Sequence, residues 1–373
     1  FLLKSSIRDV QEKELRIILG CYREGEIKEL SEGQRELAIR YAKEQSQRLG
    51  RDVTLLEGEE KKQGQMFLVD LYRMLEPGTA EGFDSLFDSA DGEIEEFDRY
   101  NIMYIAYTSD EPLHSLFFET LGSYTIGSLG LRGTSYFSAG DNTINFDVST
   151  AFYNCPKGAY NTFFHECGHA IDYQLGEDGF YSVSYDGGAN YGIIYDDVYG
   201  YIGEQIDAYG ESNGMKNIAE LKSKILASIK RGDTFLLNDR QKEKYEIIKK
   251  QIYKEFSRIS GSHKYKTDAG RLAGTMMLAG VSDVYGGITN NVVVGNRGHF
   301  DKNEEYQYIY WYNPESGEKT GAQEKEMWAH YFSFSICGDA EAVGEMEKYL
   351  PETMGQYDRM AQDMMEEAGG IDG

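Results

Sequence analysis

The sequence has few cysteines and little positive charge, and it lacks a long apolar run. Its four cysteines follow no regular spacing, which excludes a disulfide-based scaffold and fits a reducing compartment. Because no stretch approaches about 18 consecutive apolar residues, we expect no membrane-spanning helix. The formal net charge of −25 argues against nucleic acids and anionic membranes as partners, because binding either requires a basic surface.

At 373 residues, the chain is long enough to bury a large core. Its first 75 residues are charged and show the apolar periodicity of three or four helices. The segment Glu76–Gly78 breaks this pattern, and an acidic, loop-like stretch follows as far as Gly92. We therefore expect a helical N-terminal region over residues 1–90 and a second domain over residues 91–373.

The most informative feature is the pentapeptide His-Glu-Cys-Gly-His at residues 165–169. On a helix, His165 and His169 project from one face, and two neutral imidazoles at this spacing can bind one Zn²⁺. Glu166 is placed to accept a proton from a zinc-activated water. With six histidines in the chain, finding two of them around a glutamate by chance is roughly a one-in-a-hundred event. The motif therefore predicts a catalytic zinc site with Glu166 as its general base.

The residues around this motif predict a helix from about 156 to 175, preceded by a β-hairpin. The helix has an aromatic apolar stripe and a stop signal at Gly176. Upstream, residues 136–139 and 143–148 read as two strands joined by a turn at Gly140–Asn142. We expect an α+β fold, in which the edge strand of this hairpin can pair with an extended peptide.

Two histidines do not complete a catalytic zinc site, which requires three protein ligands and a water. The preferred third ligand is Glu326, because a second predicted helix places it and His330 together on one face. The apolar stripe of that helix is formed by Met327, Tyr331 and Phe334. Glu324 and His330 are the fallback ligands. Asp172 is expected to orient a ligand histidine, with direct metal binding as its alternative role.

Hydrolysis of an amide also requires a hydrogen-bond donor for the developing oxyanion, in addition to the metal. The preferred candidate is His299, which ends the glycine-flanked segment Gly295–His299. The second candidate is Tyr310, in an aromatic cluster sixteen residues before Glu326. The alternative interpretations are a loop-capping role for His299 and a core position for Tyr310.

Several segments beyond the motif resemble one set of zinc metallopeptidase domains. The segments are Val281–Thr289, Gly298–His299, Tyr310–Trp311, Lys325–Ala329 and Tyr349–Glu352. The resemblance spans roughly residues 95–362. It is to domains attached to phage Mu F-like head-morphogenesis proteins and to bacterial polymorphic toxins, and more distantly to the catalytic domain of anthrax lethal factor. It implies a zincin-like, gluzincin-type metalloendopeptidase with Zn²⁺ as cofactor and Glu326 as third ligand.

The sequence departs from this resemblance in an insertion between about residues 176 and 267, which bears on specificity. Residues 181–210 are rich in tyrosine, glycine and aspartate, and we interpret them as a long adaptable loop. This loop is either a flap over an extended substrate or an ordered surface segment. Residues 216–271 are basic and predict two amphipathic helices, the second beginning at Asn238–Asp239. Ser282–Asp283 is expected to begin a further helix.

These patterns predict a zinc metallopeptidase that hydrolyses peptide bonds in a peptide or protein substrate, basic substrates included. One alternative is a phage head or assembly protein with a vestigial or self-processing zincin domain. Another is a zinc hydrolase that acts on a non-peptide amide. The apolar start before Lys4 is too short for a signal peptide, so we expect a cytoplasmic or phage-associated protein. Secretion by a route without a signal peptide is the alternative location, and the oligomeric state is left open.

Overall fold

A computed structural model describes residues 22–23, 26–27, 86–87, 94, 102, 105–106, 109–127, 135–145, 160–177, 179–259, 279–290, 292–293, 310–313 and 315–368. This part of the chain is mostly helical and contains a small mixed sheet, which agrees with the expected α+β class. Near the N-terminus, β1 (Tyr22–Arg23) pairs antiparallel with β2 (Glu26–Ile27). The helices expected over residues 1–75 otherwise lie outside the described residues. Among the helices that are described, none combines the length and apolar character needed to cross a membrane.

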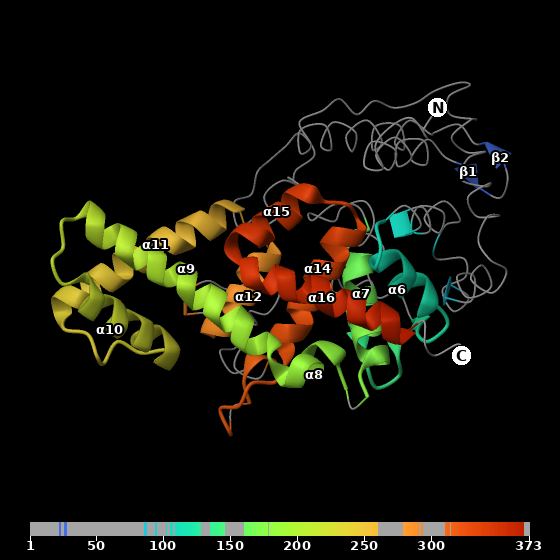
Figure 1. Cartoon of the computed structure of the whole chain (residues 1–373), viewed down its shortest axis with the longest axis horizontal. Helices are drawn as coiled ribbons and strands as arrows, with labels where there is room; N and C mark the ends of the chain where they lie inside the picture. The colour runs from blue at the N-terminus through green and yellow to red at the C-terminus, as the bar shows by residue number, and fades with distance from the viewer. Residues whose placement is uncertain are drawn as a thin grey trace.

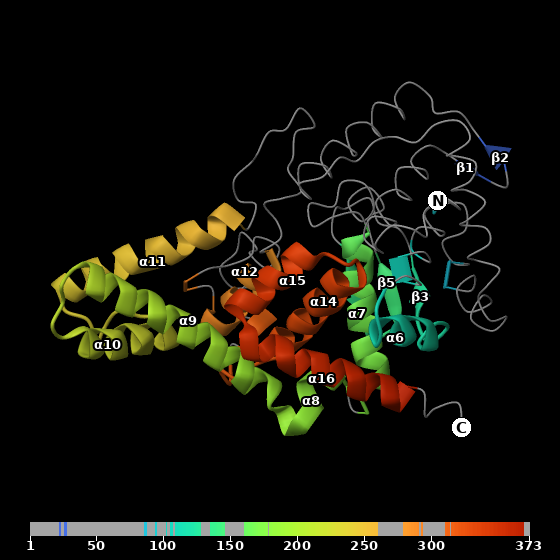
Figure 2. The same ribbon diagram turned by 45° about the horizontal axis from the view of Figure 1, so that its top comes forward.

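The small sheet has the strand order β3-β5-β4. Strands β4 (Tyr136–Ser138) and β5 (Thr143–Asn145) are antiparallel, so the predicted hairpin is confirmed. Strand β3 (Thr125–Ile126) runs parallel to β5 on its other side. The sheet packs against helix α7 (Asn161–Leu175), and α6 (Leu113–Glu119) lies beside it (Figure 2).

Helix α7 forms the centre of the fold together with α14 (Ala322–Ile336), which is buried along almost its whole length. The two helices approach closely at Gly168, where a Cβ atom would lie 3.1 Å from the Cα of Ala329. Trp328 Nε1 also donates a hydrogen bond of 2.8 Å to the carbonyl oxygen of Gly168. Helix α7 begins later than predicted, because Tyr160 has a left-handed φ of 63° that interrupts a helix.

Three further helices pack around this central pair (Figure 1). They are α12 (Ala279–Thr289), α15 (Ala340–Tyr349) and α16 (Pro351–Ala368). Asp339 accepts a hydrogen bond from Ala342 N and thereby caps α15, and α16 begins with a proline, which suits the first turn of a helix. Ser282 and Asp283 do not begin a helix as expected. They lie inside α12, where both are buried.

Residues 181–210 form helices, so the predicted adaptable loop is wrong. Helix α8 (Tyr181–Gly188) is followed by α9 (Asn190–Ser212). Helix α9 buries an apolar stripe with helical spacing, formed by Ile194, Val198, Ile202 and Ile206. Two of its glycines, Gly203 and Gly210, are closely approached by neighbouring side chains, whereas Gly192 and Gly200 face open space. At Gly210, for example, a Cβ atom would lie 2.4 Å from Ile218 Cγ1.

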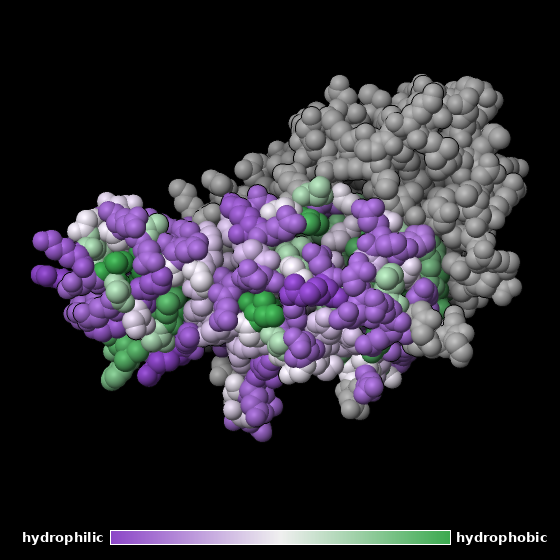
Figure 3. All heavy atoms as spheres, viewed as in Figure 1, coloured by the Kyte–Doolittle hydropathy of each residue, from purple (hydrophilic) through white to green (hydrophobic). Residues whose placement is uncertain are grey.

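The basic segment after α9 forms the predicted pair of amphipathic helices, α10 (Ile218–Arg231) and α11 (Asp239–Ile259). Asn238 and Gln241 exchange two hydrogen bonds of 3.0 Å as a capping box, which confirms the start signal at this position. Together with α9, these helices form an arm that projects from the central helices (Figure 1). On the face drawn in Figure 3, most of the coloured surface is hydrophilic, and the arm carries apolar patches. Its exposed large apolar residues are Phe235, Leu236 and Ile247.

Candidate metal centre

Helices α7 and α14 bring the three predicted metal ligands together. His165 and His169 lie one turn apart on α7, and their ring centroids are 4.9 Å from each other. Glu326 projects from α14 between them. Its Oε2 atom lies 3.3 Å from Nε2 of His165, and its Oε1 atom lies 3.7 Å from Nε2 of His169. The side chains of the two histidines are 10% and 13% exposed, and that of Glu326 is 5% exposed.

This arrangement fits a zinc ion in its chemistry and in its spacing. Two imidazole nitrogens and one carboxylate oxygen are a donor set of catalytic zinc sites. Ligand atoms about 2.0–2.1 Å from a tetrahedral zinc are about 3.4 Å apart from one another. The separations of 3.3 and 3.7 Å are close to this value. One ligand atom from each of the three residues lies within 4.8 Å of the others, so a metal ion can contact all of them.

The predicted general base and one predicted oxyanion donor lie at the same place. Glu166 is 5% exposed and follows His165 on α7. The hydroxyl of Tyr310 donates a hydrogen bond to Oε1 of Glu326. Burial raises the pKa of Tyr310 well above its usual value, and the negative charge of Glu326 raises it further. The charges of Asp283 and Glu166 act in the same direction. Tyr310 therefore keeps its proton and can act as a donor.

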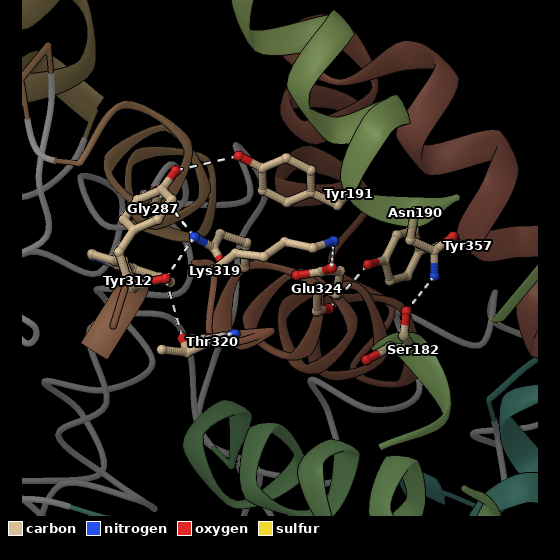
Figure 4. A network of polar contacts seen from close by, with 12 residues as sticks. Ser182, Asn190, Tyr191, Gly287, Tyr312, Lys319, Thr320, Glu324 and Tyr357 are labelled. Atoms are coloured by element: carbon tan, nitrogen blue, oxygen red, sulfur yellow. Dashed lines mark hydrogen bonds and ion pairs between the residues drawn. The ribbon is translucent and has the colours of Figure 1, made fainter. Parts of the chain in front are cut away.

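Glu324, one of the fallback ligands, occupies another position. Glu324 is fully buried, but its Oε1 atom accepts from Lys319 Nζ at 2.9 Å, as Figure 4 shows. The position of Glu324 therefore favours its ion pair with Lys319 over the fallback role of a metal ligand. His299 lies outside the described residues, so its proposed role stays a prediction.

Asp172 also differs from the expectation that it orients a ligand histidine. Its two carboxylate oxygens accept hydrogen bonds of 2.6 Å from the backbone N–H and the hydroxyl of Ser182. These contacts fasten the start of α8 to α7. Burial raises the pKa of Asp172 from 3.8 to about 7, although the hydrogen bonds from Ser182 lower it. Asp172 is thus a structural residue that joins two helices.

Sequence reasoning missed Asp283, which lies beside the centre on α12. Oδ2 of Asp283 is 3.3 Å from Nε2 of His330, the other fallback ligand. Both side chains are almost completely buried. The available signal was an isolated acidic residue inside the otherwise apolar and small segment Val281–Ile288, because carboxylates are rarely buried without a partner.

Comparison of the chain with family models, with curated proteins and with solved structures finds no match. The chemistry of the centre is therefore argued from the chain's own residues. Those residues define a buried cluster of histidines and carboxylates that could hold a metal ion.

Proposed function

We propose that the protein is a zinc-dependent metallopeptidase with a zincin-like catalytic domain of the gluzincin type. One observation carries this proposal. Two histidine Nε2 atoms one helical turn apart converge on a single carboxylate from a second helix, at 3.3 and 3.7 Å, with Glu166 between the histidines in sequence. An accidental pair of helix histidines would not require a buried carboxylate to face both rings. A zinc site of the His₂Glu type does place a carboxylate there, as its third protein ligand.

In this proposal, His165, His169 and Glu326 hold the zinc ion. When bound, zinc activates a water molecule and polarises the carbonyl group of the substrate. Glu166 accepts the proton of the attacking water while the water oxygen bonds to the carbonyl carbon. Glu166 then delivers that proton to the departing amine as the carbon–nitrogen bond breaks. Tyr310 would donate to the oxyanion by turning its one hydroxyl proton from Glu326 to the substrate, since that hydroxyl is protonated and lies at the centre.

The sheet supports a peptide as the substrate. Strand β4 lies at an edge of the three described strands, and it packs against the helix that carries His165 and His169. The backbone groups of an edge strand can bind an extended peptide by β-augmentation. Strand β4 would in this way position the scissile bond beside the metal. A compact non-peptide amide could not pair with the strand.

Metal analysis combined with one isosteric substitution tests the proposal. After supplementation with zinc and dialysis, the wild-type protein should contain zinc, and less than about a tenth of an equivalent would contradict the proposal. Glu166→Gln should keep the metal and lose nearly all hydrolysis of a diverse peptide library, since only the proton acceptor is removed. A wild-type protein that binds zinc yet cleaves neither itself nor the library would favour an assembly role instead.

A further inference from the structure

A second group of possible metal ligands lies directly beside the first. It consists of Asp283 from α12 and of Glu326 and His330 from α14, and one donor atom of each lies within 4.8 Å of the others. The three residues are 1%, 4% and 1% exposed. Glu326 belongs to both groups. The imidazole rings of His165 and His330 are 4.6 Å apart, so the two groups are in contact.

One distance in the second group equals one distance in the first. The distance from His330 Nε2 to Asp283 Oδ2 is 3.3 Å, equal to the distance from His165 Nε2 to Glu326 Oε2. Both are close to the separation of about 3.4 Å between ligands of a tetrahedral zinc ion. A carboxylate has two oxygens, so Glu326 can bind one ion with each. Two-metal hydrolytic sites hold their ions about 3.5–4 Å apart, which is a distance that one carboxylate can bridge.

The charges of the cluster also favour more than one cation. Asp283, Glu326 and Glu166 carry three negative charges when ionised, and each is at most 5% exposed. Among the described residues, the positive charge of Lys325 interacts with Glu326, but it interacts with Asp172 and Glu324 as well. Burying several carboxylates together is costly unless cations are present. Divalent ions bound among these carboxylates would offset their charge.

The backbone is shaped to bring these side chains together. At Gly280 on α12, a Cβ atom would lie 3.0 Å from Cγ and 3.2 Å from Nδ1 of His330. Any larger residue would therefore push the imidazole away from α12. The glycine lets His330 lie against this helix, one turn before Asp283.

We propose that Asp283, Glu326 and His330 form a second site for a divalent transition metal, with Glu326 bridging it to the site of His165 and His169. The proposal extends the proposed function, because it makes the same centre dinuclear. The ligand set has one imidazole and two carboxylates, which suits Zn²⁺ and also Mn²⁺ or Co²⁺.

The test is the metal content of the full chain, measured after removal of metal by a chelator and equilibrium dialysis against micromolar Zn²⁺ at pH 7.5. Wild-type protein should hold two equivalents, and Asp283→Asn should hold one. Asp172→Asn is the matched control, because it alters a carboxylate that is equally buried but binds Ser182. It should hold two equivalents. Zinc bound by the acidic surface contributes equally to the wild type and both variants, because their surface residues are the same. It therefore does not affect the differences between them.

The outcomes separate this proposal from the proposed function. One equivalent in the wild type, lost in Glu326→Gln, would overturn the second site and leave the peptidase proposal standing. Two equivalents in Asp283→Asn would overturn the assignment of the second site. No zinc in the wild type would overturn both proposals. If circular dichroism shows that Asp283→Asn does not fold, titration of the wild type with Co²⁺ tests the second site instead. Two spin-coupled ions in the electron paramagnetic resonance spectrum support the bridge, and two uncoupled ions or a single ion contradict it.

Discussion

Tyr310 is held in place by Glu326, the residue that links the two helices of the centre. Removal of its hydroxyl in Tyr310→Phe should leave the ring packed against Trp311, whose ring centroid lies 4.7 Å away. We expect kcat to fall by about 10²–10³-fold, the usual effect of losing one oxyanion donor. The measurement is steady-state kinetics at saturating zinc, because loss of the bond to Glu326 can also weaken metal binding by about 10–100-fold.

The matched comparison is His299→Ala, since sequence reasoning favoured His299 for the same role. A loss of kcat in Tyr310→Phe alone assigns the role to the tyrosine. Full kcat in Tyr310→Phe, together with a 10²–10³-fold loss in His299→Ala, would return the role to the histidine.

Asp172 should make the stability of the protein depend on pH. Burial raises its pKa to about 7 in the folded state, against 3.8 for an ordinary aspartate. Between these values the folded state binds more protons than the unfolded state, so stability from this group decreases as pH rises. We therefore expect Asp172→Asn to gain stability relative to wild type as pH increases from about 5 to 7. Urea unfolding at several pH values measures this difference.

The prediction concerns how the stability difference between variant and wild type changes with pH. The absolute size of that difference does not test it, because asparagine also changes the hydrogen bonds with Ser182. If the difference between variant and wild type stays constant from pH 5 to pH 7, the pKa of Asp172 is not raised. If the carboxylate were instead stabilised in its ionised form, the wild type would gain stability relative to the variant as pH rises toward about 5, around the ordinary aspartate pKa of 3.8.

At the scale of elements, the centre depends on how closely α7 and α14 approach. Gly168→Ala would place a methyl group 3.1 Å from the Cα of Ala329 and 3.3 Å from Cβ of Phe332. The backbone of α14 must move to accept it, and such overpacking typically costs about 1–3 kcal/mol. This should exceed the gain of about 1 kcal/mol from the better helix propensity of alanine. We expect a lower melting temperature and weaker zinc binding, measured by thermal unfolding and metal titration.

Gly200→Ala provides the control for helix propensity. Gly200 lies inside α9, is exposed, and has open space where a Cβ atom would be. This substitution should therefore stabilise the protein by roughly 0.5–1 kcal/mol. If Gly168→Ala proves as stabilising as Gly200→Ala, a methyl group at residue 168 does not force α7 and α14 apart, and the prediction is wrong.

The same elements show what the sequence allows one to predict. The hairpin, the helix that carries His165, and the start of α11 after Asn238 are local features, and their residues predicted them. The convergence of Glu326 on both histidines is a tertiary contact. It was predicted from the face that Glu326 shares with His330 and from the resemblance to gluzincin-type domains.

Two features could not be predicted in this way. The contact of Asp283 with His330 depends on the packing of α12 against α14, which no local pattern encodes. The helical state of residues 190–212 was missed because glycine and tyrosine indicated a loop. The apolar stripe of α9 overrides those propensities, since tertiary burial contributes more than the backbone preference of a few glycines.

For the whole molecule, the centre joins segments that lie far apart in the chain. The helix with His165 and His169 precedes the helices of the arm in the chain, and the helix with Glu326 follows them. A metal ion that binds the folded state alone therefore stabilises the complete arrangement rather than one element. The contribution is about 2.7 kcal/mol when free zinc is at 100 times its dissociation constant.

We therefore expect removal of metal to lower the melting temperature of the wild-type protein by about 3–4 °C. Differential scanning calorimetry with zinc and with a chelator measures this shift. Glu326→Gln should abolish the shift, because the carboxylate that faces both histidines is lost. Glu324→Gln is the matched control on the same helix, since Glu324 is equally buried but pairs with Lys319. Its shift should equal that of the wild type. An equal loss in both variants would show that the effect arises from disturbance of α14 rather than from the metal ligand.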